Sequence, residues 1–197
     1  MNKALLRNNA RHEAGHWVTG WVLGEYSKKI VLSMPSNGRW VAYCEREGYQ
    51  DLENIKGINA TLGDRVINLL AGAKAESMTS DGFNNEIYKD LIADGNGAWP
   101  DFYLASELYR LYYRSLPVLT RGSFEDEWDA INERCETILI KYKSFIDNVG
   151  IMALIRYSSS TEAVVTFSKE ELITLFNNCE HKNDADKLPG QSNENSA

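Results

Sequence analysis

The sequence predicts one mainly α-helical domain that carries a small β-hairpin. Apolar residues recur at three- to four-residue steps over most of the chain, which is typical of helices that bury one face. Only residues 29–34 and 39–44 are rich in β-branched and aromatic side chains, and the Pro-Ser-Asn-Gly segment at 35–38 between them is a turn signal. A chain of 197 residues, 43% of them hydrophobic, can bury a substantial core without disulfides or metal.

Three helices are expected in the first part of the chain. The first covers about five turns, from Leu5 to Val22, and ends before the stop signal of Gly24. The second runs from Asn59 to about Met78 and is rich in small side chains that permit close packing, and residues 81–85 interrupt the pattern after it. The third begins near Pro100, whose missing N–H costs nothing in a first helical turn, and it runs through Tyr112.

Two further helices are expected before a polar tail. One covers roughly Phe124 to Val149, and the pair Ser168 and Glu171 forms a capping-box start for a short last helix through Phe176. We therefore expect one domain at residues 1–178. Residues 179–197 are polar and are expected to be disordered.

Composition and charge exclude several classes of protein. The net charge is −7, the isoelectric point lies near 5.1 and the basic residues are scattered, which argues against a nucleic-acid-binding surface. Cys44, Cys135 and Cys179 are widely spaced and predict neither a disulfide framework nor a cysteine zinc site. Because no signal peptide and no apolar stretch near 18 residues occurs, we expect a cytoplasmic protein without a membrane segment.

The most informative motif is the pentapeptide at residues 12–16, His-Glu-Ala-Gly-His, inside the first expected helix. Its spacing places His12 and His16 on the same face, where both rings can bind one cation at about 2 Å. Glu13 lies beside them and can act as the general base on a metal-bound water. The motif predicts a zinc hydrolase site. The alternative, two core histidines satisfied by hydrogen bonds, is less favoured for a complete pentapeptide on an apolar helix.

A hydrolytic zinc site needs a third protein ligand and an open position. Asp101 is favoured by its place in the first turn of a helix, where the helix dipole attracts a carboxylate and a rigid element holds it. The same placement also fits a carboxylate that only complements the dipole. His181 is an alternative, although it lies in the polar tail. Spacing alone does not choose among the acidic candidates, which are Glu76, Asp81, Glu86, Asp94 and Asp101.

Several stretches occur in a recognisable order between about residues 8 and 176. They are residues 11–16 with 18–21, the hairpin segment 29–44, the small-residue segment 67–76 that ends in an Ala-Glu pair, residues 97–101 leading into 105–108, and more weakly residues 166–172. In this order the chain resembles the peptidase domain of the FtsH family of membrane-anchored, ATP-dependent zinc metalloproteases.

The resemblance implies a helical, zincin-like metallopeptidase domain. It implies that His12, His16 and Asp101 bind Zn²⁺ and that Glu13 is the catalytic base. It also implies a peptide substrate that lies extended beside the hairpin strand, for which residues 40–43 are the candidates. Glu76 either orients a ligand imidazole or is a solvated helix end.

The expected function is therefore zinc-dependent hydrolysis of peptide bonds in unfolded or flexible protein segments. We expect a protein or peptide substrate and a possible homo-oligomer. No phosphate-binding loop is present, so a possible ATPase or unfoldase would be a separate partner. Two alternatives stay open, a non-catalytic protein-binding module with this fold and a zinc hydrolase of non-peptide amides. The ligand set also suits iron, manganese or cobalt.

Overall fold

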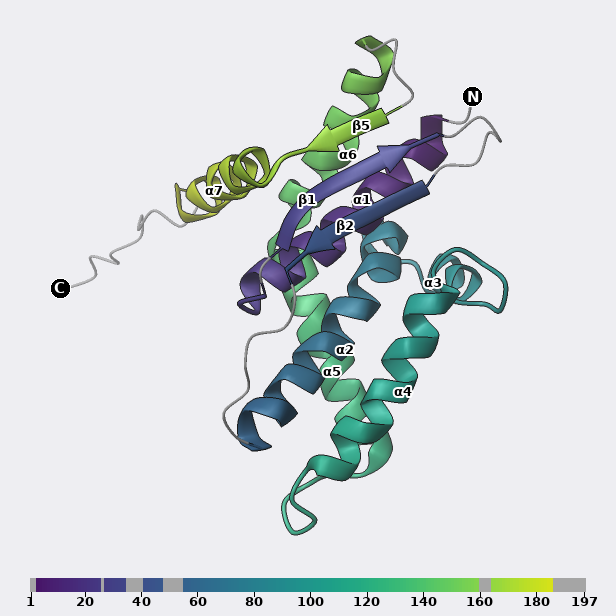
Figure 1. Cartoon of the computed structure of the whole chain (residues 1–197), viewed down its shortest axis with the longest axis vertical. Coiled ribbons are helices and arrows are strands. Elements are labelled where there is room, and N and C mark those ends of the chain that lie inside the picture. Colours follow the sequence, from purple (N-terminus) through teal and green to yellow (C-terminus); the bar gives the residue numbers. More distant parts are fainter. Residues whose placement is uncertain (1–2, 26, 35–40, 48–54, 160–163, 186–197) are drawn as a thin grey trace, which may run out of the picture.

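Helix α1 (Lys3–Val22) is the centre of the fold, because three other helices and the main sheet pack against it (Figure 1). The computed structural model describes residues 3–25, 27–34, 41–47, 55–159 and 164–185. These residues form a mainly helical arrangement with a small antiparallel sheet, as the sequence predicts. After α1 the elements are β1 (Ser27–Ser33), β2 (Val41–Arg46), α2 (Ile55–Ser77), β3 (Met78–Thr79), β4 (Gly82–Phe83), α3 (Asn85–Leu91), α4 (Trp99–Ser115), α5 (Phe124–Lys141), α6 (Lys143–Ser159), β5 (Val164–Phe167) and α7 (Lys169–Ala185).

The expected hairpin is present as strands β1 and β2, which pair antiparallel with Ile30 opposite Cys44. Its turn, together with Trp40, lies outside the described residues. A third strand, β5, pairs with the other edge of β1, so β1 is central and β2 is an edge strand. The sequence analysis missed β5 because four residues carry too little alternation to distinguish a strand, although Val165 and Phe167 do face the core.

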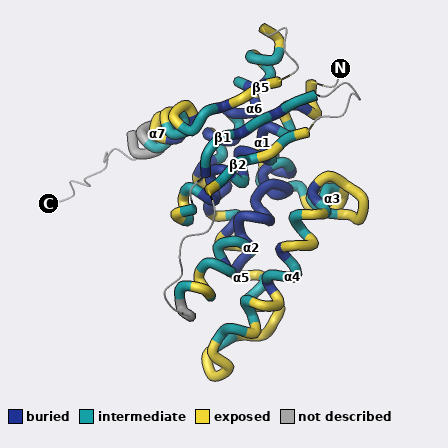
Figure 2. Tube along the Cα trace, in the orientation of Figure 1, coloured by how far each residue is buried: buried dark blue, intermediate teal, exposed yellow. Residues whose placement is uncertain are grey.

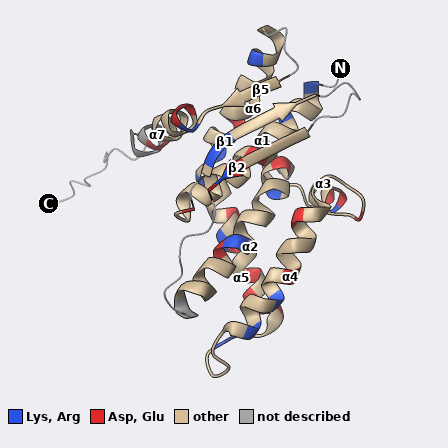
Figure 3. Cartoon of the chain, viewed as in Figure 1, with Lys and Arg blue, Asp and Glu red and all other residues tan. Residues whose placement is uncertain are grey.

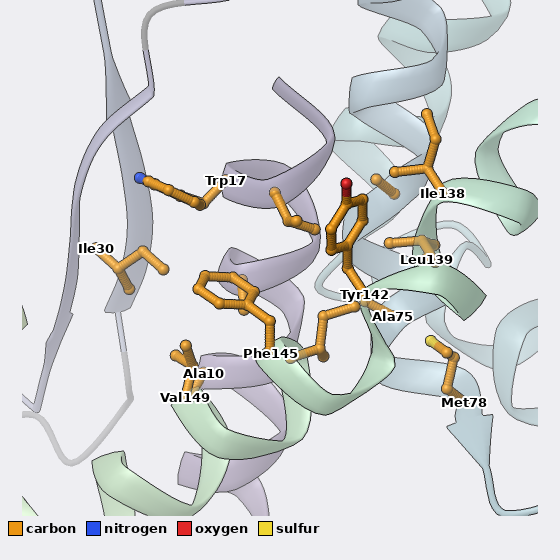
Figure 4. Packing of buried hydrophobic residues seen from close by; sticks show 14 of the residues in the cluster. Ala10, Trp17, Ile30, Ala75, Met78, Ile138, Leu139, Tyr142, Phe145 and Val149 are labelled. Atoms are coloured by element: carbon orange, nitrogen blue, oxygen red, sulfur yellow. The ribbon is translucent and has the colours of Figure 1, made fainter. Parts of the chain in front are cut away.

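The core lies where α1, α6 and the sheet meet. Figure 4 shows Trp17 of α1 facing Ile30 of β1 and Phe145 of α6, and the two aromatic rings lie 5.3 Å apart. All three side chains are fully buried, and each contributes roughly 1.5–3 kcal/mol by leaving water. The polar end of the indole is satisfied, because Trp17 Nε1 donates to the Lys28 carbonyl at 3.1 Å. This packing fixes α1 against the sheet.

Helices α1 and α2 approach so closely that a side chain is excluded between them. A Cβ atom on Gly15 would lie 2.6 Å from the carbonyl oxygen of Ala71 and 2.6 Å from the Cβ of Ala75. The small residues that the sequence places on α2 therefore let its backbone reach the helix that carries the His-Glu-Ala-Gly-His motif.

A buried arginine joins α1 to the end of α2 and to α6. Arg11 donates through Nη2 to the carbonyl oxygen of Met78 at 2.7 Å, and its Nε lies 3.2 Å from Asp147 Oδ1. Its Nη1 also donates to the carbonyl of Glu76 at 3.4 Å. These bonds satisfy carbonyl groups at the end of α2 that have no partner within the helix.

The single helix expected from Phe124 to Val149 is wrong, because the chain breaks at Tyr142 into α5 and α6. The apolar periodicity continues through the break, and neither Gly nor Pro marks it. The Tyr142 ring stacks on Phe176 at 4.8 Å and its hydroxyl donates to Glu180 at 2.8 Å. The break lets α5 pack against α2 while α6 packs against α1.

The last helix starts as expected but runs further. Ser168 and Glu171 form the reciprocal capping bonds, with each backbone N–H donating to the other side chain at 2.9 and 3.3 Å. Helix α7 continues to Ala185, so the expected end at Phe176 is wrong, whereas the expected disorder of the tail stays a prediction. Cys179 is buried, so the helix packs against the core at least to that residue. Residues 186–197 lie outside the described residues.

Buried residues concentrate where α1, α2 and the sheet meet, whereas α3 and the end of α4 are largely exposed (Figure 2). The short α3 follows the interruption expected at residues 81–85 and was itself not predicted. Its N-cap is Asn84, whose side chain accepts from the backbone N–H groups of Glu86 and Ile87. Among the helices of the described ranges, none combines the length and the apolar character that a membrane span requires.

Candidate metal centre

His12 and His16 lie one helical turn apart on α1, on the face that meets α2. Their rings are in edge contact, with centroids 4.8 Å apart. Both side chains are mostly buried, with 12% of each exposed. The pair is therefore held in a confined space.

Each imidazole is oriented by a partner at its Nδ1 atom. His16 Nδ1 lies 2.7 Å from the carbonyl oxygen of Asn68, and His12 Nδ1 lies 3.3 Å from Glu76 Oε2. A carbonyl oxygen only accepts hydrogen bonds, so Nδ1 of His16 is the donor, and in the neutral ring the Nε2 lone pair can bind a cation. The side chain of Asn68 adds a second bond between α1 and α2 here, because its Nδ2 donates to the carbonyl of His16 at 2.7 Å.

Asp101 reaches the same point from α4. It lies in the first turn of that helix, as the sequence predicts, and its Oδ2 is 3.3 Å from His16 Nε2 and 3.7 Å from His12 Nε2. Tetrahedral zinc with bonds of about 2.0–2.1 Å would place its ligand atoms roughly 3.3 Å apart. Within the described residues, His12, His16 and Asp101 form a group whose ligand atoms all lie within 4.8 Å of one another. The spacing suits a small divalent cation.

Gly72 on α2 provides the room for this convergence. A Cβ atom at this position would lie 2.4 Å from the Nε2 atoms of both His12 and His16. Helix α2 packs against both α1 and α4, so its missing side chain leaves the space in which ligands from the other two helices meet. This space fits a bound cation, because two imidazole nitrogens border it and the Asp101 carboxylate lies 3.3 Å from one of them.

The charges around the site favour a cation. Burial lowers the pKa of His12, but the hydrogen bonds that its imidazolium donates to Asp101 and Glu76 raise it more, and the balance is a pKa of about 10. Burial likewise raises the pKa of Asp101, but its bonds to His12 and His16 hold that pKa well below its usual range. In the absence of metal, a proton supplies the positive charge that this arrangement stabilises.

The other sequence candidates lie elsewhere, with one exception. Glu76 contacts His12 and is only 10% exposed, so it has the position of an orienting carboxylate and not that of a solvated helix end. His181 lies in α7, which packs against α6 and β1. The three remaining acidic candidates are exposed and stand outside the group, and they are Asp81, Glu86 and Asp94.

Glu13 lies beside this group at the edge of an open pocket. The residue is only 7% exposed, and none of the hydrogen bonds or ion pairs found among the described residues involves its carboxylate. The pocket has a volume of about 240 Å³. Its lining joins residues of α1, α2 and α4 to the edge strand β2, and it comprises Glu13, His16, Ser27, Ala42, Tyr43, Cys44, Arg46, Arg65, Asn68, Leu69 and Asp101.

Several of these positions escaped the sequence analysis. Gly72 belongs to a segment noted only for small side chains, and its contact with both imidazoles depends on how α2 crosses α1. Asn68 orients His16 through its backbone carbonyl, which leaves no mark on the residue type. Nothing in the sequence indicated that Arg65 lines the pocket, because a single arginine on a helix is usually a surface residue.

No protein-family model matches the chain, and no curated protein shows significant similarity to it.

Proposed function

We propose that this chain is a zinc-dependent metalloendopeptidase that cleaves unfolded or flexible protein segments, with a zincin-like domain of the FtsH peptidase type. One observation carries the proposal. Two imidazole Nε2 atoms and the Asp101 carboxylate converge over Gly72, while the buried carboxylate of Glu13 faces the pocket beside them. A buried carboxylate next to such a group has a use in hydrolysis that a purely structural metal site would not require.

His12, His16 and Asp101 would hold the metal ion. Two imidazoles and one carboxylate form the ligand set of many hydrolytic zinc sites, although iron, manganese and cobalt accept it as well. Bound zinc would supply a water of lowered pKa and would polarise the substrate carbonyl.

Glu13 moves the proton in the proposed reaction. Its carboxylate accepts a proton from the attacking water and returns it to the amine that leaves when the peptide bond breaks. Its burial keeps bulk water away from this transfer, and no described partner competes for its oxygens. Glu76 and Asn68 hold the imidazoles in the orientation that the reaction needs.

The edge strand β2 provides a place for an extended substrate. Among the strands of the described ranges it pairs with β1 alone, and three of its consecutive residues, 42–44, line the pocket next to Glu13. A peptide that adds to this edge would be held through its backbone, which tolerates many sequences. Only extended chains can bind in this way, so we include a separate ATPase or unfoldase as a possible partner for folded substrates.

The test is casein cleavage by the zinc-loaded protein. We expect the wild type to cleave casein and Glu13→Gln to lose roughly 10²–10⁴-fold in rate, because a general base contributes that much. Zinc content should stay the same in the variant. The matched control is Glu86→Gln, whose side chain is 89% exposed and lies outside the site. Stoichiometric zinc with no cleavage would instead favour a protein-binding module or an amide hydrolase.

A further inference from the structure

Two arginines share the pocket with the candidate metal centre. Arg65 on α2 and Arg46 at the end of β2 both line it, together with Glu13 and Asp101. They approach from different walls, one helical and one from the edge strand, and Figure 3 shows basic residues on both the sheet and α2. Neither is needed to hold the metal or to move the proton.

Arg65 is tied to the metal-site helix through one residue. Its Nη1 donates to Asn68 Oδ1 at 2.7 Å, and Asn68 Nδ2 donates to the carbonyl of His16 at 2.7 Å. Asn68 itself is only 4% exposed. The planar guanidinium is therefore held in a defined position by its Nη1 bond. Arginine is the side chain best suited to bind a carboxylate in such a pocket, because its planar group is always charged and matches carboxylate geometry.

Cys44 lines the same pocket as Glu13 and the two arginines. Burial raises the pKa of its thiol and the charge of Glu13 raises it further, whereas Arg46 and Arg65 lower it. One side chain in the pocket thus lies within the electrostatic range of Glu13 and of both guanidinium groups. Arg46 also has an acidic neighbour, since its Nη1 is 3.4 Å from Glu25 Oε2.

We propose that Arg65 binds a substrate carboxylate next to the bond that is cleaved, so that the enzyme prefers peptides carrying a negative charge there. The carboxylate is either an Asp or Glu side chain or the C-terminus of the peptide. This inference rests on the proposed peptidase function. The preference is local, because a chain with a net charge of −7 repels acidic peptides at long range.

The first experiment maps cleavage sites in a proteome-derived peptide library. For the wild type we expect a carboxylate at one fixed position relative to the cleaved bond. The enrichment should disappear in Arg65→Gln and turn towards Lys and Arg in Arg65→Glu. It should persist in Arg110→Gln, which removes an exposed arginine of α4 that pairs with Glu107. An enrichment that survives Arg65→Gln would overturn the proposal.

Synthetic peptides distinguish the two carboxylate sources. One pair carries Glu or Gln beside the cleaved bond, and a second pair ends in a free acid or an amide. For one of these pairs we expect the wild type to show a roughly tenfold higher kcat/KM for the charged member, and Arg65→Gln to bring this ratio close to one. Arg65→Lys, which keeps the charge but loses the fork, should fall between them. Equal ratios in wild type and Arg65→Gln would contradict the role of Arg65.

Binding separates this proposal from the proposed catalysis. The same peptide pairs, labelled with a fluorophore, are titrated into zinc-loaded Glu13→Gln protein and followed by anisotropy. If the Glu13→Gln protein binds the charged member more tightly, and the double variant with Arg65→Gln does not, carboxylate recognition is supported even if no peptide is cleaved. Equal affinities overturn it even if casein is cleaved.

Discussion

At the scale of single residues, a missing side chain allows the candidate metal centre to form. Gly72 lies against the Nε2 atoms of His12 and His16, at a distance where any Cβ would overlap both rings. The imidazoles cannot retreat freely, because Glu76 and the carbonyl of Asn68 hold their Nδ1 atoms. An added methyl group must therefore displace ligand atoms, and metal sites tolerate displacements of only about 0.5 Å.

Gly72→Ala should weaken zinc binding by roughly tenfold to a hundredfold. Titration with a competing chelator measures the affinity, and circular dichroism checks the fold. Gly97→Ala is the matched control, since a Cβ there would meet nothing within 4 Å. Equal zinc affinities for the two variants would contradict the geometry assigned to Gly72.

The protonation of His12 predicts how the metal-free protein responds to pH. Despite burial, Asp101 and Glu76 raise the pKa of His12 to about 10 from an unfolded value near 6.5. The stabilisation by this imidazolium is therefore complete below pH 6.5 and is lost as the pH rises towards 10. Urea unfolding in the presence of a chelator should show the wild type losing stability over this window more steeply than His12→Gln. Parallel profiles would contradict the assigned ion pair.

The residue types predicted this site only in part. The spacing of His12 and His16 was sufficient to place both rings on one face, since helical geometry alone fixes that relation. Asp101 was one of several acidic candidates, because its approach to the histidines depends on how α4 packs against α2. Asn68 and Gly72 could not be identified, since one acts through its backbone and the other through an absent side chain.

At the scale of secondary-structure elements, the contact between α1 and α2 positions the site. Gly15 lies inside the His-Glu-Ala-Gly-His motif, yet its role is to let the backbone of α2 approach. Because Ala71 contributes a backbone oxygen to this contact, the neighbour cannot move aside as a flexible side chain would. The crossing of these two helices also brings Gly72 to the histidines.

Gly15→Ala should destabilise the protein by up to about 2 kcal/mol. Alanine gains about 1 kcal/mol in helix propensity, but overpacking a tight contact costs about 1–3 kcal/mol and prevails where the obstacle is backbone. Urea unfolding of the metal-free proteins measures the difference from wild type. An unchanged or raised unfolding free energy would mean that α1 and α2 lie further apart than described here.

The elements themselves were predictable where their patterns were long. The helices near residues 5–22 and 59–78 and the pairing of the hairpin strands follow from periodicity and turn chemistry. The break at Tyr142 did not, because α5 and α6 share one apolar pattern and tertiary contacts of the Tyr142 ring determine the bend. β5 was too short to recognise without its partner β1.

At the scale of the whole molecule, the candidate metal centre joins separate parts of the fold. Its ligands come from α1 and α4, which both pack against α2. The hydrophobic core around Trp17 and Phe145 is built of apolar side chains from the helices and the sheet and includes none of the three candidate ligands. The fold should therefore persist without metal, while a bound ion adds a link between the two helices.

Removal of the metal should lower stability without abolishing the fold. At free zinc of about 100 times its dissociation constant, binding adds roughly 2.7 kcal/mol to the unfolding free energy, which corresponds to about 5–10 °C in Tm for a chain of this length. Calorimetry with and without chelator measures this shift, and circular dichroism should show the same helix content in both states. A metal-free protein that loses its helices would contradict the independence of the core.

The central claim is that His12, His16 and Asp101 together bind one metal ion, and a zinc titration of wild type beside Asp101→Ala tests it most directly. Inductively coupled plasma mass spectrometry after removal of loose metal gives the number of bound ions per chain. We predict one zinc per wild-type chain and a large loss in Asp101→Ala. A wild type that retains no zinc, or an Asp101→Ala protein that retains as much as wild type, would contradict the claim.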